Sequence, residues 1–203
     1  KSRFAYTVDG GHLGELETEC FNAFRSDVVF TGNSIHTGNA RPDFVNAVSM
    51  ASAFVQSLPH TQRPETTDGR QGFFAPMNIE GAVESATVSL LLRDFDMSGM
   101  EKRKSLVEQL AQAVAASFGG KVQVSHVQQY LNMKGVLDGH PQVVENLVAA
   151  YSEAGVQAVF VPIRGGTDGS RLTEMGIPTP NIFTGGHNFH SRSEWARFSQ
   201  MIY

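Results

Sequence analysis

Apolar positions in the middle of the chain follow the spacings of helices and strands. In residues 44–58 they stand three and four positions apart, as on one face of a helix, and Pro42 suits its first turn. Residues 98–118 predict a longer helix, because Ser98 precedes a glutamate by three positions and Gly119 follows the last residue. Four other segments have the composition of strands: residues 27–31, 73–79, 82–93 and 121–128. The order βαββαβ predicts an α+β domain, with two helices on one face of a four-stranded antiparallel sheet.

Strand and helix alternate in the segments on either side of this domain, an arrangement typical of α/β folds. The predicted strands are residues 4–8, 13–20, 157–162 and 181–184. The predicted helices are residues 141–154 and 170–175. We therefore expect one α/β domain made of residues 1–20 and 133–203, interrupted by an inserted α+β domain at residues 21–132.

Composition and charge narrow the class of protein. Of the 203 residues, 41% are hydrophobic and 18% are charged, as in ordinary soluble domains. The net charge of -4 gives no reason to expect nucleic acid as a partner. No apolar run approaches the ~20 residues that span a bilayer, and no signal peptide is visible, so we expect no membrane partner and a cytoplasmic location. Cys20 is the single cysteine, which excludes an internal disulfide and agrees with a reducing compartment.

Two segments carry residues suited to binding a metal ion. Asp9 follows an apolar strand, and sites in α/β sheets form outside the carboxyl ends of strands. Its carboxylate could ligate a metal or act as a base, or it could simply cap a turn. His187 and His190 stand three residues apart beside a pair of glycines, which suggests imidazole ligation of zinc. The alternative is a pair of surface histidines near the start of a helix. Glu194 suits either a partner of such a ligand or an acid in that helix's first turn.

Three further residues are candidates for binding a substrate. Arg164 begins a glycine-rich segment, where backbone N–H groups and the guanidinium could hold a carboxylate, although a plain turn has the same composition. His36 lies on a loop between a strand and a helix, where a histidine is usually just solvated. Arg93 ends an apolar strand and could form an ordinary salt bridge with Asp94 or Asp96.

Several common catalytic signatures are absent from the sequence. It contains no Gly-x-Ser-x-Gly, no phosphate-binding Gly-Lys-Ser/Thr loop, no His-Glu-x-x-His and no Cys-x-x-Cys. Cys20 lies in an acidic stretch, which should raise the pKa of its thiol and make it a poor nucleophile. These absences argue against a serine hydrolase, a P-loop enzyme and a thiol enzyme.

Taken in order, six segments resemble the M20 family of two-zinc peptidases, and its tripeptide aminopeptidases in particular. The segments are residues 7–11, 32–38, 92–96, 130–133, 163–169 and 181–194. The resemblance implies a catalytic α/β domain that holds two zinc ions and is interrupted by a lid domain. It implies that Asp9 ligates one zinc and His190 the other, with His187 as the alternative to His190. It also implies that His36 assists catalysis by donating to the oxyanion, and that Arg93 and Arg164 bind the carboxylate of the tripeptide.

The implied activity is zinc-dependent release of the N-terminal residue of tripeptides, by a homodimer formed through the lid. In relatives that dimerise in this way, the lid histidine can reach the partner subunit's site. The family's other zinc ligands and its general-base glutamate have no match here, so we expect this chain to be the C-terminal portion of such an enzyme and inactive by itself. The alternatives are another M20 hydrolase, namely a dipeptidase, carboxypeptidase or deacylase, and a non-catalytic module that associates with itself.

Overall fold

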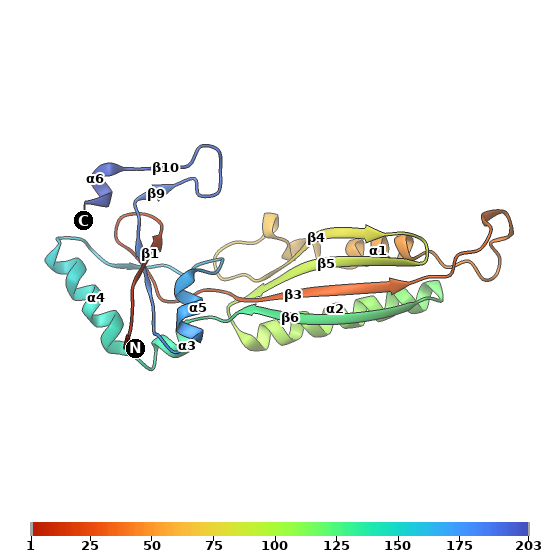
Figure 1. Cartoon of the computed structure of the whole chain (residues 1–203), viewed down its shortest axis with the longest axis horizontal. Coiled ribbons are helices and arrows are strands. Elements are labelled where there is room, and N and C mark those ends of the chain that lie inside the picture. The colour runs from red at the N-terminus through yellow and green to blue at the C-terminus, as the bar shows by residue number, and fades with distance from the viewer. Residues whose placement is uncertain (1, 203) are drawn as a thin grey trace. The chain divides into compact units, whose positions relative to one another are not determined.

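The protein is described here from a computed structural model, which describes residues 2–202 (Figure 1). The chain divides into two compact units. Unit 1 contains the residues up to Phe21 and those from Tyr130 onward, and unit 2 runs from Asn22 to Gln129. Among the described residues, no helix is both long and apolar enough to cross a bilayer.

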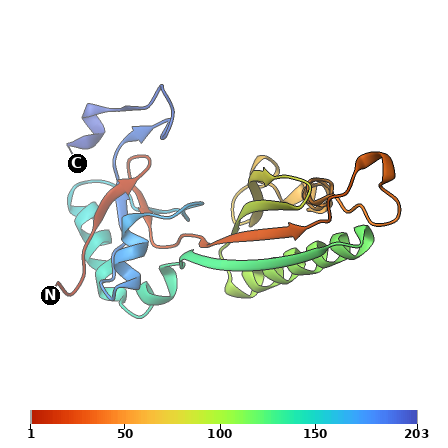
Figure 2. The ribbon, with the colours of Figure 1, turned by 45° about the vertical axis from the view of Figure 1, so that its right-hand side comes forward.

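Unit 2 is a four-stranded sheet covered on one face by two helices. In chain order its elements are β3 (Asn22–Thr31), α1 (Ala47–Ser57), β4 (Phe73–Gly81), β5 (Ser85–Asp94), α2 (Met97–Phe118) and β6 (Lys121–Tyr130). The strand order is β4-β5-β3-β6, and β5 is antiparallel to both of its neighbours. Figure 2 shows α2 lying along these strands. Three short 3-10 turns fill the loops: η1 (Thr37–Asn39), η2 (His60–Gln62) and η3 (Pro64–Thr66). The predicted α+β sheet with two helices is confirmed.

The core of unit 2 lies between the sheet and the two helices. Phe54 of α1 and Phe30 of β3 are fully buried, and their ring centroids are 5.9 Å apart. From the other helix, Val107 and Ala111 are buried against the same sheet. Aromatic and aliphatic burial on this scale supplies most of the free energy that favours folding, at about 25 cal/mol per Å² of apolar surface.

The ends of the two long helices differ in part from the sequence prediction. α1 begins at Ala47, because Asn46 Oδ1 accepts hydrogen bonds from the N–H groups of Val48 (2.9 Å) and Ser49 (3.3 Å). The prediction that Pro42 lies in its first turn is therefore wrong. α2 follows Asp96, so that Ser98 lies inside the helix and is not its N-cap. Its predicted end is confirmed: Gly119 has φ 73°, a left-handed conformation that favours glycine.

Replacing Asn46 with alanine should lower the free energy of unfolding of unit 2 by about 1 kcal/mol, because two N–H groups of α1 lose their acceptor. Urea denaturation followed by circular dichroism would measure the change. Asn46→Asp is the matched control, since aspartate caps helices about as well as asparagine. Equal losses in both variants would contradict this role of the cap.

Unit 1 contains a small mixed sheet. Its strands are β1 (Thr7–Gly10), β2 (Glu15–Glu17), β7 (Val159–Phe160) and β8 (Asn181–Phe183). The strand order is β1-β8-β2-β7, with β8 parallel to β1 and antiparallel to β2. The helices are α3 (Lys134–Leu137), α4 (Pro141–Glu153), α5 (Asp168–Glu174) and α6 (Phe198–Met201), and a hairpin is formed by β9 (Gly186–His187) and β10 (Trp195–Ala196).

One face of this sheet packs against α4. Leu147 and Tyr151 of the helix bury against Leu16 and Phe183, with the rings of Tyr151 and Phe183 5.3 Å apart. The paired strands are shorter than the apolar runs that predicted them. Cys20 lies beyond the end of β2, where it forms an isolated parallel bridge with Ile163 and packs in a separate cluster with Met133 and Leu137.

Candidate metal and substrate site

Asp9 lies on β1, next to the residue that ends the strand, and its side chain is exposed. It borders an open pocket of ≈ 510 Å³ in unit 1. The pocket is lined by Thr7, Val8, Tyr130, Gly166, Thr167 and Asp168 in addition to Asp9. It therefore lies where β1 meets the loop that leads into α5, at the carboxyl end of a strand, as α/β sites generally do.

The charges around Asp9 show which residues lie near it. Its surroundings partly desolvate the carboxyl and thereby raise its pKa, and the charge of Asp168 raises the pKa further, whereas His190 lowers it. The carboxyl of Asp9 is thus within electrostatic reach of Asp168 and of His190, which comes from the far end of the chain. Asp168 destabilises the ionised form of Asp9, and a cation nearby would stabilise that form.

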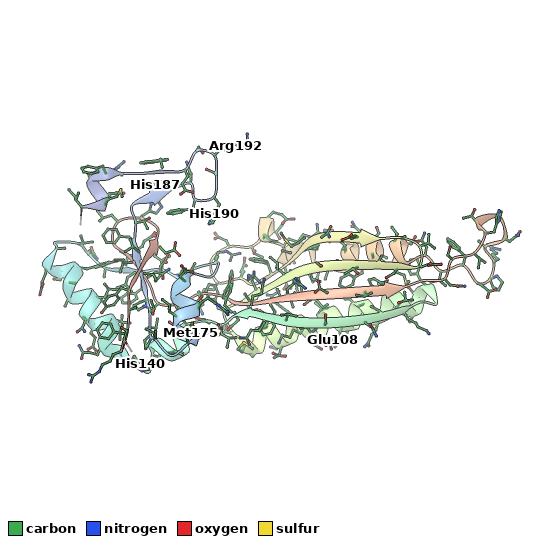
Figure 3. The ribbon with its side chains drawn as sticks, viewed as in Figure 1. Glu108, His140, Met175, His187, His190 and Arg192 are labelled. Carbon is green, nitrogen blue, oxygen red and sulfur yellow. The ribbon has the colours of Figure 1, made fainter. Side chains whose placement is uncertain are left out.

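His190 occupies the loop of the β9–β10 hairpin, where Figure 3 labels it. The residue is exposed and has φ 62°, and its backbone N–H donates to Glu194 Oε2 at 2.9 Å. The alternative that these histidines lie near the start of a helix is wrong, because the next helix begins only at Phe198. For the same reason Glu194 is not a first-turn acid. It fixes the backbone of His190 in an uncommon left-handed conformation.

His187 is held differently from His190. Its ring stacks on Trp195, with centroids 4.1 Å apart and planes 13° apart, and also contacts the ring of His12 at 4.8 Å. The side chain is half-buried, and its Nε2 is buried without a hydrogen-bond partner among the described residues. His187 therefore belongs to an aromatic stack that fastens the hairpin, while the ring of His190 stays accessible at its turn.

Arg164 lies in the loop between β7 and α5 and is half-buried. Its guanidinium stands 5.3 Å from the centre of the Phe21 ring, a cation–π arrangement that orients the side chain. Two residues further on, Gly166 touches the ring of Tyr130 so closely that a Cβ would come within 2.5 Å of Tyr130 Cζ. Gly166 is thus needed for close packing against Tyr130, in addition to the candidate role of this loop in binding.

His36 and Arg93 belong to unit 2. His36 is exposed just before η1, and its Nδ1 accepts a hydrogen bond from the N–H of Gly38 at 3.1 Å. Arg93 is only 8% exposed, and its Nη1 donates to the carbonyls of Leu92 (2.9 Å) and Phe24 (3.3 Å). The neighbouring Asp94 pairs with another cation, Arg103, at 2.9 Å.

Within unit 2, His36 and Arg93 lie toward opposite ends of the sheet. Strand β3 runs antiparallel to β5, with Ala23 opposite Arg93 and Thr31 opposite Ser85. His36 follows Thr31, so eight residue steps of strand separate the two ends, or about 26 Å. A tripeptide is about 10 Å long when extended, so it cannot reach both side chains of one unit 2.

The chain provides only part of a metal site. Within residues 2–202, no three or more histidine, cysteine, aspartate or glutamate side chains are arranged to hold a metal ion. Asp9 and His190 offer a carboxylate and an imidazole, both ligand types that zinc accepts, but a protein zinc site has three or four such ligands. Asp9 and His190 could therefore provide some of the ligands of a zinc site, but not all of them.

Two residues of this region escaped the sequence analysis. Glu17 is buried on β2, and Asn181 is fully buried on β8, where its amide Nδ2 donates to Glu17 Oε2 at 3.1 Å. In the sequence, Glu15, Glu17 and Glu19 alternate with other residues, which is the pattern of a solvated strand face. The pKa of the Cys20 thiol is raised to about 11, in the expected direction but mainly by burial and only to a smaller extent by Glu174 and Glu19. A thiol with such a pKa is a poor nucleophile.

Comparison with known proteins identifies the family. Residues 18–121 match the model of the M20 peptidase dimerisation domain, and the chain belongs to the M20 family, as the sequence predicted. Among individual proteins it is most usefully compared with Peptidase T. It is 44% identical over 202 residues to Peptidase T of Exiguobacterium sibiricum and 43% identical over 199 residues to that of Clostridium perfringens. These matches cover 99% and 98% of this chain but 49% of either relative, so the chain spans about half the length of the curated relatives it matches.

Solved structures show the same fold. The aminopeptidase PepT from Bacillus cereus superposes with a TM-score of 0.79 at 20% identity, covering 99% of this chain and 54% of that one. A Bacillus subtilis protein described as a dinuclear metal-binding peptidase of the M20 family superposes with a TM-score of 0.65 at 13% identity, covering 97% of this chain and 51% of that one. The predicted α/β fold with an M20 dimerisation domain is confirmed.

Proposed function

We propose that this chain supplies part of the active site of a zinc-dependent tripeptide aminopeptidase of the peptidase T type. The observation that carries the proposal is that Asp9 borders the pocket and that His190, from the far end of the chain, is near enough to lower the pKa of the Asp9 carboxyl. The 44% identity to Peptidase T supports the choice of reaction.

In this proposal Asp9 and His190 each ligate one of two zinc ions, which supply Lewis acidity at the scissile carbonyl when bound. His190 is preferred to His187 because its ring is accessible at the hairpin turn, whereas the ring of His187 is clamped against Trp195. Glu194 then acts as the orienting partner of His190 through its backbone N–H. The remaining ligands and the general base come from a part of the enzyme that this chain does not contain.

Arg164 and Arg93 are proposed to bind the C-terminal carboxylate of the tripeptide. Arginine presents two parallel N–H donors that match the two oxygens of a carboxylate. A fixed arginine also selects for substrate length, because a longer peptide places its carboxylate elsewhere. Length selection of this kind distinguishes a tripeptidase from the alternative M20 activities on dipeptides or N-acyl amino acids.

His36 is proposed to donate a hydrogen bond to the developing oxyanion, in the site of a partner subunit. Its separation from Arg93 in unit 2 means that one copy of the chain cannot present both side chains to one tripeptide. The match of residues 18–121 to a dimerisation domain supports a second copy as the source. The proposed enzyme is therefore a homodimer with two sites, each completed by the other subunit's histidine.

The decisive experiment restores the missing part. The segment of Exiguobacterium sibiricum Peptidase T without a counterpart here would be joined to this chain at the junction that their alignment defines, giving a restored enzyme. With zinc, the restored enzyme should hydrolyse Leu-Gly-Gly and leave Leu-Gly and Leu-Gly-Gly-Gly almost intact, and a chelator should abolish the activity. The 203-residue chain alone should be inactive. Preferential cleavage of dipeptides or N-acetylated amino acids would replace the tripeptidase assignment with another M20 activity.

A further inference from the structure

A buried polar network connects three elements of unit 1 beneath the pocket. Its centre is Asn181, which has no exposed surface. On one side, Asn181 Nδ2 donates to the carboxyl of Glu17 on β2 at 3.1 Å. On the other side, Asn181 Oδ1 accepts from the hydroxyl of Thr7 on β1 and from the hydroxyl of Thr167, which precedes α5, at 3.3 Å. One amide thus joins β2, β1 and the start of α5.

The first turn of α5 is seated directly on this network. A Cβ built on Gly169 would come within 2.6 Å of Asn181 Oδ1 and 3.0 Å of Thr7 Oγ1, so only glycine permits the approach. Thr167 is also the N-cap of α5, because its hydroxyl accepts from the N–H of Ser170 at 3.2 Å. Movement of the network would therefore move the start of the helix.

The residues that the network holds are those that border the candidate site. Thr7 stands two positions before Asp9 on the same strand, and Thr167 stands three positions after Arg164 in the same loop. Thr7 and Thr167 both line the pocket that Asp9 lines. The network consequently sets the separation between the strand that carries the proposed metal ligand and the loop that carries the proposed carboxylate-binding arginine.

Burial of an acid at position 17 opposes folding, because its carboxyl group loses contact with water. Glu17 is 8% exposed, and desolvation raises its pKa to about 7; the hydrogen bond from Asn181 lowers the pKa, while the charges of Glu15 and Asp9 raise it. A leucine of similar volume at this position would avoid the desolvation of a carboxyl group. Buried acids kept at such a cost are common at functional sites, where a hydrogen-bonded group fixes its neighbours.

We propose that Glu17 is a positioning residue: through Asn181 it holds Asp9 and the Arg164 loop at the separation that a tripeptide requires. The inference rests on the proposed function, since the separation matters only if both residues contact one substrate. It assigns to Glu17 no contact with substrate or metal.

The first test uses the 203-residue chain and hydrogen exchange at two hydrogen-bonded amides. The N–H of Thr7 donates to Pro180 O, and the N–H of Ser170 donates to Thr167. Glu17→Leu should raise the exchange rates of both amides by about tenfold or more relative to the rest of unit 1, because the network loses its anchor. Glu17→Gln, which keeps an acceptor oxygen, should leave them near the unsubstituted rates. Unchanged rates in Glu17→Leu would overturn the inference.

The matched control removes hydrogen bonds of the same sheet that lie outside the network. The hydroxyl of Tyr151 donates to the carbonyl of Glu15 at 2.9 Å and accepts from the N–H of Phe183 at 3.5 Å, and Tyr151→Phe deletes both while keeping every side chain of the network. This variant should leave the exchange of Thr7 and Ser170 unchanged relative to unit 1. An effect as large as that of Glu17→Leu would mean that the sheet responds generally, which contradicts a specific role. If Glu17→Leu does not fold, Thr7→Val removes one branch of the network and takes its place.

The second test is kinetic and uses the restored enzyme. At equal folded fraction, Glu17→Leu should lower kcat/KM for Leu-Gly-Gly by about 10- to 100-fold, whereas Glu17→Gln and Tyr151→Phe should stay within about twofold of the unsubstituted enzyme. Faster exchange with unchanged kinetics would overturn the positioning role. If the unsubstituted restored enzyme cleaves no tripeptide, the proposed function has failed, and that outcome is recognised before any variant is compared.

Discussion

Replacing His36 with alanine in the restored enzyme should lower kcat/KM for Leu-Gly-Gly by about 100- to 1,000-fold, the usual effect of removing one oxyanion donor. Asp9→Asn should cause a loss at least as large, because a metal ligand loses its charge. When the two variant subunits are co-expressed, activity should return to about one quarter of that of the unsubstituted enzyme. Steady-state kinetics on the purified mixture would measure the recovery.

The recovery follows from the geometry of unit 2. Arg93 lies at one end of its sheet and His36 beyond the other, across about 26 Å of strand. If each site takes its histidine from the other subunit, a mixed dimer has one site with both substitutions and one site with neither. Random pairing makes about half of the dimers mixed, and each of these has one intact site out of two, which gives the quarter.

Two controls make the result specific. His60→Ala also changes a histidine of unit 2, at the start of η2, and should leave kcat/KM within about twofold in either pairing. Mixing His36→Ala subunits with more His36→Ala subunits should recover nothing. Absence of recovery in the His36→Ala and Asp9→Asn mixture would show that His36 acts within its own subunit or has no catalytic role.

The architecture of unit 2 was predictable because its signals are local. The apolar spacing in residues 44–58, the glycine after residue 118 and the four apolar runs each depend on neighbours within one element. The prediction erred at Pro42 and Ser98: the side chain of Asn46 caps α1 further along the chain, and α2 already begins directly after Asp96, which makes no side-chain capping hydrogen bond. Such errors shift an end by a few residues without changing the fold.

The candidate site was predictable only in part, for a related reason. Asp9 could be identified because a carboxylate directly after an apolar strand is itself the signal. The hairpin that carries His190 gave no such signal, since its pairing of Trp195 with His187 spans eight residues of polar and aromatic sequence. The burial of Glu17 depends on β8 and α5, which follow it by about 150 residues. No local pattern contains that information.

The burial of Glu17 also predicts how the stability of the chain depends on pH. Its pKa is raised from 4.5 to about 7 in the folded chain. Between these values the folded chain keeps a proton that the unfolded chain has lost, so the free energy of unfolding should fall as pH rises from about 4.5 to about 7 and then level off. The size of the fall is up to about 3 kcal/mol for Glu17 alone.

Urea denaturation of the 203-residue chain at pH 5 and pH 8 would measure this fall, with the fluorescence of Trp195, the single tryptophan, reporting on unit 1. Asp9 contributes with the same sign, because its pKa is also raised, so the two acids are separated by substitution. Glu17→Gln should remove most of the difference between the two pH values, and Asp9→Asn only a smaller part. If the free energy of unfolding still falls between pH 5 and pH 8 in Glu17→Gln, groups other than Glu17 cause the fall. Equal stability of the unsubstituted chain at both pH values would contradict the burial of an ionisable Glu17.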